Sequence, residues 1–399
     1  MNEANSQALA RMAAVRPQWV AVRNAGEALG LEGRTLLHAG PSRLDPARLP
    51  PPMRHAAMLS CVHENWAKST EEAGRLLASG AVRLEPSHTR SVAVPLAGMV
   101  SPRTSLAEIR ASSSGSARRY FGFLGTGAGA QQRFGALDPA ILERLRFREE
   151  VLAPGLTELL AGGPVDLLAI ARAAIREGDD LHNRLSSATA ILCSVLSTRK
   201  TDSEKAQTAL AAVAEALLYF LNVWMPACQL MLLAGEGVKG SSLVTRLCAN
   251  GEEIGIQVAG LPGEWFTAPA TKVEGPFMKG APADAVHPPA TGDSGVIDAF
   301  GLGGQGLRHA PSLLEAFKPW LEADDDARAR SLLAGQHPIL ETPFALDAAA
   351  VAKSGRPALL STGMTSADGR GLLGRGLCRV PLAPFSAAVA RLSQERALE

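Results

Sequence analysis

Residues 209–235 read ALAAVAEALLYFLNVWMPACQLMLLAG, the most apolar stretch of the chain. Glu215, Asn222 and Pro226 interrupt the stretch, and their presence disfavours a membrane span. We interpret it as two buried helical segments that meet at Pro226, since proline breaks or kinks a helix. Such a stretch indicates a large core or a subunit interface, and we expect at least a homodimer.

The length and composition of the chain limit the classes of protein to which it can belong. The chain has 399 residues, 46% of them hydrophobic and 20% charged, with a net charge of +1. This length predicts more than one domain. The absence of a basic stripe, with only two Tyr and five Trp, argues against nucleic-acid binding. Five scattered cysteines without a CxxC pair, and an N-terminus unlike a signal peptide, predict a reduced, cytoplasmic protein.

Outward from the apolar stretch, we predict a mixed α/β fold with three domains. Residues 1–137 form the first, an α/β domain, in which residues 1–30 are predicted as a helix carrying Pro17. TLLHAGPSR (35–43) is predicted as a strand and turn, and ASSSGSARRYFGFLG (111–125) as a polar turn followed by an aromatic strand. Residues 138–235 are predicted to be a helical domain, and residues 236–399 a Gly-rich α/β domain with site loops.

REGDDLHNR (176–184) places several charged and polar groups between two apolar segments. If the stretch is helical from Asp179, then Asp179 shares a face with His182 and Asn183. The acids equally suit a capped helical turn, in which Asp179 or Asp180 caps the next helix. His182, however, suits acid–base work, and Asn183 and Arg184 supply hydrogen-bond donors for an oxyanion or a carboxylate.

Four Gly- or Ser-rich segments are further candidates for anion binding. In VKGSSLVTRLCAN (238–250), Gly240-Ser241-Ser242 is predicted to open a helix, and a plain N-cap explains it equally well. TGDSGVIDAFGLGGQG (291–306) matches neither a Walker loop nor a clean dinucleotide fingerprint, but its backbone N–H groups suit an anion. GEWFTAPA (263–270) and STGMTSADGRG (361–371) complete the set. Neither zinc-ligand spacing nor a GxSxG elbow occurs, and we expect no metal and no cofactor.

Taken together, these segments resemble the YlbE-like domain-of-unknown-function family. The resemblance rests on LLHAGP (36–41), GDDLHNR (178–184), KGSSLVTRLCANGEEIGIQVAG (239–260), WFTAPA (265–270), GDSGVIDAFGLGG (292–304) and STGM…GRG (361–376). It implies an oxamate carbamoyltransferase subunit that works with an FdrA-like partner on small anions, namely oxamate or oxalurate and carbamoyl phosphate. YFGFLGTGAGAQQRFGAL (120–137), SHTRSVAVPLAG (87–98) and STGMTSADGRG depart from the family pattern, so the substrate could differ from oxalurate.

Carbamoyl transfer needs donors aimed at the carbamoyl oxygen and positive charge or N–H groups for phosphate. We assign the catalytic roles to His182, Asn183 and Arg184, with Asp179 orienting His182. The residues predicted to bind substrate or phosphate are Gly240, Ser241, Ser242, Thr267, Asp293, Ser294, Gly303, Gly304, Thr362 and Gly363. Two alternatives stay open: a phosphate-independent hydrolase or lyase of a ureido acid, and a non-catalytic subunit that completes a partner's site.

Overall fold

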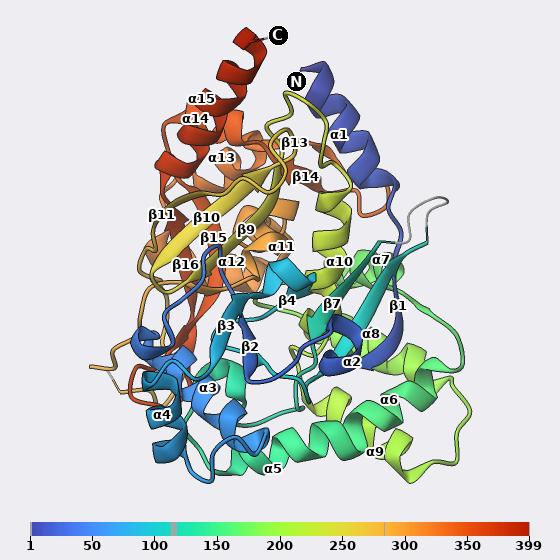
Figure 1. Ribbon diagram of the computed structural model, residues 1–399. Helices are drawn as coiled ribbons and strands as arrows, with labels where there is room; N and C mark the ends of the chain where they lie inside the picture. Colours follow the sequence, from blue (N-terminus) through green and yellow to red (C-terminus); the bar gives the residue numbers. More distant parts are fainter. Residues whose placement is uncertain (1, 113–117, 283, 399) are drawn as a thin grey trace.

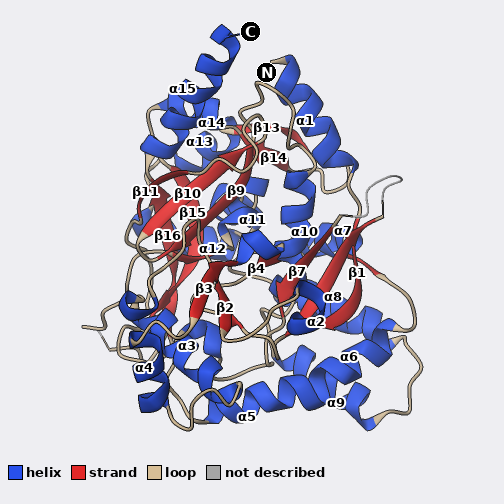
Figure 2. Ribbon diagram, viewed as in Figure 1, coloured by secondary structure: helices blue, strands red, loops and turns tan. Residues whose placement is uncertain are grey.

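A computed structural model describes residues 2–112, 118–282 and 284–398. The fold is mixed α/β, as predicted, with several small sheets packed among helices (Figures 1 and 2). Residues 113–117, which hold most of the predicted polar turn, lie outside the described part. None of the helices in the described residues combines the length and the apolar character needed to cross a membrane.

The helices surround the sheets on most sides, and α10 lies among them near the middle of the molecule (Figure 1). Their bounds are α1 Glu3–Ala14, α2 Ala25–Leu29, α3 Pro51–His63, α4 Thr70–Ala78, α5 Ala140–Phe147, α6 Ala153–Leu160, α7 Leu167–Arg176, α8 Ser186–Ser197, α9 Glu204–Glu215, α10 Leu221–Leu233, α11 Gly295–Phe300, α12 Pro311–Phe317, α13 Asp325–Ser331, α14 Ala348–Ser354 and α15 Leu382–Leu398.

The strands form five small sheets in the described residues. One sheet has the order β4-β7-β6-β1-β8, a second β11-β10-β9-β12 and a third β3-β2-β5, and two hairpins pair β13 with β14 and β15 with β16. Their bounds are β1 Pro17–Asn24, β2 Thr35–His38, β3 Arg83–Pro86, β4 Val92–Ala93, β5 Met99–Val100, β6 Ser105–Ala111, β7 Arg119–Phe123, β8 Val165–Asp166, β9 Val244–Asn250, β10 Glu253–Val258, β11 Phe266–Pro269, β12 Thr291–Gly292, β13 Leu333–Gln336, β14 Pro343–Leu346, β15 Ala358–Thr365 and β16 Leu372–Val380.

Two segments predicted as helices are strands in part or in full. The helix predicted across residues 1–30 ends at Ala14, and Pro17 begins β1, a position where a strand needs no ladder donor. The helix predicted after Gly240-Ser241-Ser242 is β9, whose residues are buried on both faces apart from Arg246. Burial on both faces suits a central strand and removes the helical periodicity on which the prediction depended.

The apolar stretch also divides differently from the prediction. The break falls at residues 216–220, and Pro226 lies inside α10 rather than between two helices. Proline has no N–H to donate to the carbonyl four residues earlier, which is that of Asn222. Strand β7 lies against this point, since the Cβ that Gly122 lacks would stand only 1.8 Å from the Asn222 oxygen. The missing side chain therefore lets β7 approach the helix backbone.

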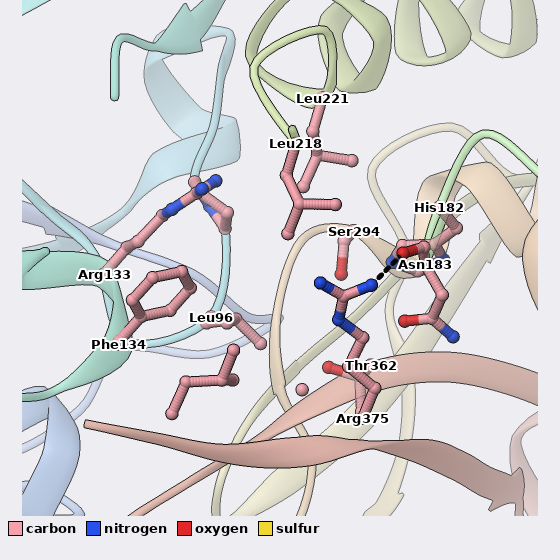
Figure 3. Close-up of a pocket in the computed structure, with 13 residues that line it drawn as sticks. Leu96, Arg133, Phe134, His182, Asn183, Leu218, Leu221, Ser294, Thr362 and Arg375 are labelled. Atoms are coloured by element: carbon pink, nitrogen blue, oxygen red, sulfur yellow. Dashed lines mark hydrogen bonds between the residues drawn. The ribbon is translucent and has the colours of Figure 1, made fainter. Parts of the chain in front are cut away.

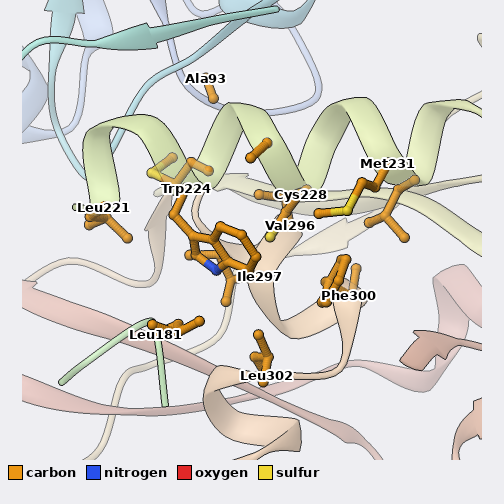
Figure 4. Packing of buried hydrophobic residues seen from close by; sticks show 14 of the residues in the cluster. Ala93, Leu181, Leu221, Trp224, Cys228, Met231, Val296, Ile297, Phe300 and Leu302 are labelled. Atoms are coloured by element: carbon orange, nitrogen blue, oxygen red, sulfur yellow. The ribbon is translucent and has the colours of Figure 1, made fainter. Parts of the chain in front are cut away.

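One apolar core crosses all three predicted domains. Helix α10 contacts β6 and β7 of the first sheet and β9 of the second, and its Trp224, Cys228 and Met231 face Phe300 of α11 (Figure 4). Strand β8, from the predicted helical domain, pairs with β1. The boundaries at residues 137 and 235 stay predictions, and the structure adds that a shared core spans both of them.

We expect Gly122→Ala to lower the free energy of unfolding by about 1–3 kcal/mol, because the new methyl group forces β7 away from α10. The matched control is Gly74→Ala in α4, where the nearest atoms would lie 3.8 Å from the new Cβ. There alanine should stabilise the protein by about 0.5–1 kcal/mol through its helix propensity. Denaturant unfolding of the two variants checks the contrast, and equal midpoints would contradict it.

Candidate functional site

The loop from residue 177 to residue 185 joins α7 to α8 and is not helical, which corrects the prediction of a helix from Asp179. The Asp180 carboxylate organises the loop. It accepts hydrogen bonds from the backbone N–H groups of His182 (3.1 Å), Asn183 (2.9 Å) and Arg184 (2.7 Å). Leu181 adopts a left-handed φ of 58° between them. A short buried aspartate thus holds three successive N–H groups, as in an Asx-type turn.

Asp179 serves the helix that follows. One of its oxygens accepts from the N–H of Ala188 in the first turn of α8 (2.8 Å), and the other pairs with Arg184 (3.0 Å). Arg184 also donates to the carbonyl of Glu177 (3.0 Å). Asp179 is therefore not the N-cap residue of α8, which is Leu185, but its side chain binds the first turn of that helix across the loop.

His182 is oriented by Asp298 of α11, not by Asp179. Its Nδ1 lies 3.0 Å from the Asp298 carboxylate, and both side chains are buried. The other Asp298 oxygen accepts from the N–H groups of Gly304 (2.7 Å) and Ser361 (2.8 Å), which fixes the carboxylate in place. A Cβ on Gly303 would stand 2.8 Å from the His182 Nδ1, so only glycine allows the GLGG turn to pack here.

This contact sets the charge on the imidazole. Burial, the largest single effect, lowers the pKa of His182, but the adjacent Asp298 carboxylate together with Asp180 outweighs burial, and the pKa of His182 lies above its ordinary value near 6.5. With Nδ1 held by Asp298, the remaining ring nitrogen, Nε2, is the one available to a ligand. A histidine held in this way is suited to donate a proton near neutral pH.

His182 lines a cavity formed by segments that lie far apart in the sequence (Figure 3). The cavity has about 420 Å³ of empty space, a volume that includes the solvent at its open mouth. Asn183 and Ser294 stand near His182, and the amide nitrogen of Asn183 is a buried donor that lacks a partner among the described residues. The lining consists of Pro95, Leu96, Arg133, Phe134, His182, Asn183, Leu218, Leu221, Ser294, Thr362, Gly363, Leu372 and Arg375.

Two arginines give the cavity positive charge. Arg375 of β16 donates to the carbonyl of Asn183, and Arg133 packs its guanidinium 4.8 Å from the Phe134 ring centroid. Arg133 is only 4% exposed, and no carboxylate of the described residues is among the groups that shift its pKa. Burial and the nearby Arg375 lower the pKa of Arg133 to about 10, so it stays charged at neutral pH. A buried cation without a counter-ion points to an anionic ligand.

The sequence comparisons show the family of the chain. The family model described as oxamate carbamoyltransferase subunit AllG matches residues 82–294, more than half of the chain, including Arg133, the 177–185 loop and Ser294. The chain is 30% identical to the oxamate carbamoyltransferase subunit AllG of Escherichia coli (strain K12), over 98% of this chain and 97% of the relative. The chain belongs to the AllG family.

Two further similar proteins extend the comparison. An uncharacterised Escherichia coli (strain K12) protein, YahG, is 28% identical over 97% of this AllG-family chain and 84% of its own length. A crystal structure of a conserved protein of unknown function from Enterococcus faecalis V583 superposes with a TM-score of 0.88 at 25% identity, over 98% of this chain and 97% of the other. The fold is thus shared along nearly the whole chain.

The cavity brings together part of the predicted AllG-family site. Among the predicted residues, His182, Asn183, Ser294, Thr362 and Gly363 line it. Gly303 and Gly304 lie directly behind His182, where their N–H groups donate to the Asp180 carbonyl and to Asp298 rather than to a ligand. Asp179 and Arg184 are outside the lining, in the pair that closes the loop.

The remaining predicted residues hold segments together elsewhere. Ser241 and the Ser242 backbone bind the side chain of Asn5 in α1, and the Ser242 hydroxyl binds Asp347 (2.6 Å). Gly240 directly precedes this cluster and is likewise outside the cavity lining. Thr267 is exposed on β11, beside Glu253.

Asp293 binds the segments that carry the cavity wall. Its carboxylate accepts from the N–H groups of Gly40 and Val94 (both 2.9 Å) and from the Ser87 hydroxyl (2.6 Å). Burial raises the pKa of Asp293 to about 6. Its neighbour Ser294 lines the cavity. Asp293 therefore supports the site from behind without lining it.

Sequence reasoning missed Asp298, Arg133 and Arg375. Asp298 lies inside the quoted GDSGVIDAFGLGG segment, and its single acid within an apolar turn was the available signal. Arg133 lies in the segment that departs from the family pattern, where two glutamines and an arginine follow a Gly-rich run. Arg375 stands in the GRG that closes the quoted segment 361–376, but it lies on a regular strand of a hairpin, and strand periodicity alone does not mark it as a site residue.

Proposed function

We propose that this chain is a catalytic subunit of a carbamoyltransferase and that the cavity beside His182 is its active site. The reaction moves a carbamoyl group between the nitrogen of a small amide acid, such as oxamate, and phosphate. Family membership supports the reaction class. The observation that carries the assignment of the site is the pairing of a proton-donating His182 with two arginines, the buried Arg133 and the half-buried Arg375, in one cavity.

In the phosphorolytic direction, a phosphate oxygen attacks the carbamoyl carbon of the ureido acid. The bond between that carbon and the amide nitrogen breaks, and the nitrogen takes a proton from His182 Nε2. The products are carbamoyl phosphate and the amide acid. Arg375 and Arg133 balance the charges of phosphate and carboxylate, and the Asn183 amide donates to the carbamoyl oxygen as negative charge develops there.

The proposal includes a partner, because the 30% identical relative is named as a subunit. We propose that this chain works with an FdrA-like subunit and that the two subunits together are needed for full catalytic activity. The alternatives are a hydrolase or lyase that needs no phosphate and a non-catalytic subunit.

The test is an assay of carbamoyl phosphate formation from oxalurate and its longer homologues, with the chain alone and with an FdrA-like subunit added. We expect product only when phosphate is present. Ammonia release that is unchanged when phosphate is left out would favour the hydrolase. Full activity of the complex when every lining polar residue of this chain is replaced would make the chain non-catalytic.

A further inference from the structure

The cavity wall is more apolar than its proposed reaction requires. Six of its lining residues are apolar: Pro95, Leu96, Phe134, Leu218, Leu221 and Leu372. Every heavy atom of oxamate or oxalurate is a nitrogen, an oxygen or a carbonyl-type carbon, so neither has a methylene group to place against leucine. Burying such polar atoms against an apolar wall costs free energy that no hydrogen bond returns.

The apolar residues lie between the two cations. In Figure 3, Arg133 and Phe134 stand on one side of the cavity, and Arg375 stands with His182 on the other. Leu218 and Leu221 enter from the segment that begins α10, and Leu96 faces them from the opposite wall. The site thus has two cationic ends joined by an apolar waist, which we define as Leu96, Leu218 and Leu221.

The two ends are chemically different. Arg375 lies beside the proposed proton donor His182, because it donates to the carbonyl of the next residue, Asn183. Arg133 is nearly buried without a carboxylate partner among the described residues, and it is held against Phe134. Phosphate, which reacts, belongs at the Arg375 end. A carboxylate that only anchors the acid belongs at the Arg133 end, where the planar guanidinium suits it.

We propose that the acid substrate is an aliphatic amide acid, in which at least one methylene separates the carboxylate from the amide that receives the carbamoyl group. The carboxylate pairs with Arg133, the methylene groups lie in the waist, and the amide nitrogen lies at His182. The carboxylate of oxamate is bonded directly to its amide carbon, so oxamate leaves the waist unfilled. This inference rests on the proposed carbamoyl transfer for the role of the amide.

The experiment is a calorimetric binding series with the whole protein in phosphate buffer. The ligands are oxamate, malonamate and succinamate, which have zero, one and two methylenes between amide and carboxylate. We expect affinity to rise about fourfold for each methylene buried. The variant Leu218→Asn, in the loop before α10, should remove most of this rise, so that succinamate loses more affinity than oxamate. Its matched control is Leu217→Asn, because Leu217 is 62% exposed and does not line the cavity.

The outcomes separate clearly. Tighter binding of succinamate than of oxamate, lost in Leu218→Asn and retained in Leu217→Asn, supports the proposal. Oxamate binding as tightly as its homologues overturns it, as does an equal effect of Leu218→Asn on all three acids or no binding of any of them. A methylene-dependent series in a protein that forms no carbamoyl phosphate from any acid would instead overturn the proposed function and leave the specificity of the cavity standing.

Discussion

His182→Asn is expected to lower the rate of carbamoyl phosphate formation by roughly 10²–10⁴-fold, the usual contribution of a positioned general acid. The asparagine amide nitrogen stands where Nδ1 stands in histidine, so it still reaches the Asp298 carboxylate, which lies 3.0 Å from Nδ1 in the native protein. The variant lacks any group in the place of Nε2. It therefore removes the proton donor without leaving Asp298 as an unpaired buried charge. Steady-state kinetics gives the rate, and the thermal unfolding midpoint shows whether the fold is intact.

The second variant, Asp298→Asn, tests the same His182–Asp298 pair by changing the carboxylate. In Asp298→Asn the carboxylate that raises the pKa of His182 is gone, so that pKa falls. His182 is active when protonated and loses its proton as the pH rises through its pKa. The activity of Asp298→Asn should therefore decline at lower pH than that of the native enzyme. A His182→Asn enzyme with activity within twofold of native, or an unmoved pH profile in Asp298→Asn, removes the pair from the mechanism.

Arg133→Met is expected to change stability and binding in opposite directions. Without ligand, Arg133 is a buried charge with no carboxylate partner in the described part of the chain, so its replacement by an apolar side chain should stabilise the protein by about 1–3 kcal/mol. The same change removes a charge-assisted contact worth about 1.5–3 kcal/mol, so affinity for the acid should fall roughly 10–100-fold. Calorimetry of unfolding without anions and titration with the acid measure the two effects.

A surface arginine provides the comparison. Arg75→Met in α4 removes the same charge from an exposed position, and it should alter neither the midpoint nor the affinity. If Arg133→Met loses stability as Arg133→Ala would through lost packing, the side chain is a structural support for Phe134 rather than a receptor for an anion.

The fold was predictable where periodicity is local. The strand at Thr35–His38, the helix at Pro51–His63 and the hairpin of β15 and β16 follow from apolar runs bounded by Gly and Pro. Strand β9 was not, because Ser241 and Ser242 resemble a helix start while their partner Asn5 lies more than 230 residues away. No local pattern encodes that partner.

The site was predictable to the extent that its residues cluster in sequence. His182 and Asn183 were identified because a cluster of polar groups between two apolar segments indicates either a capped turn or a functional site. Thr267 carried the same kind of signal and lies outside the cavity, since Gly- and Ser-rich turns look alike whether they bind a ligand or another part of the chain. The burial of Arg133 without a carboxylate could not be predicted, because it is a property of the assembled cavity walls.

The contact between α10 and β7 also bears on how the protein is made. Helix α10 packs on the sheet formed by β4, β7, β6, β1 and β8. The edge strand β8 of this sheet lies at residues 165–166, after the first predicted domain. A ribosome therefore releases the first 137 residues well before their cover at residues 221–233 exists. Until then the nascent strands carry exposed apolar surface and unpaired edges, the features that recruit chaperones. Biosynthesis of this chain should depend on chaperone occupancy until α10 has left the exit tunnel.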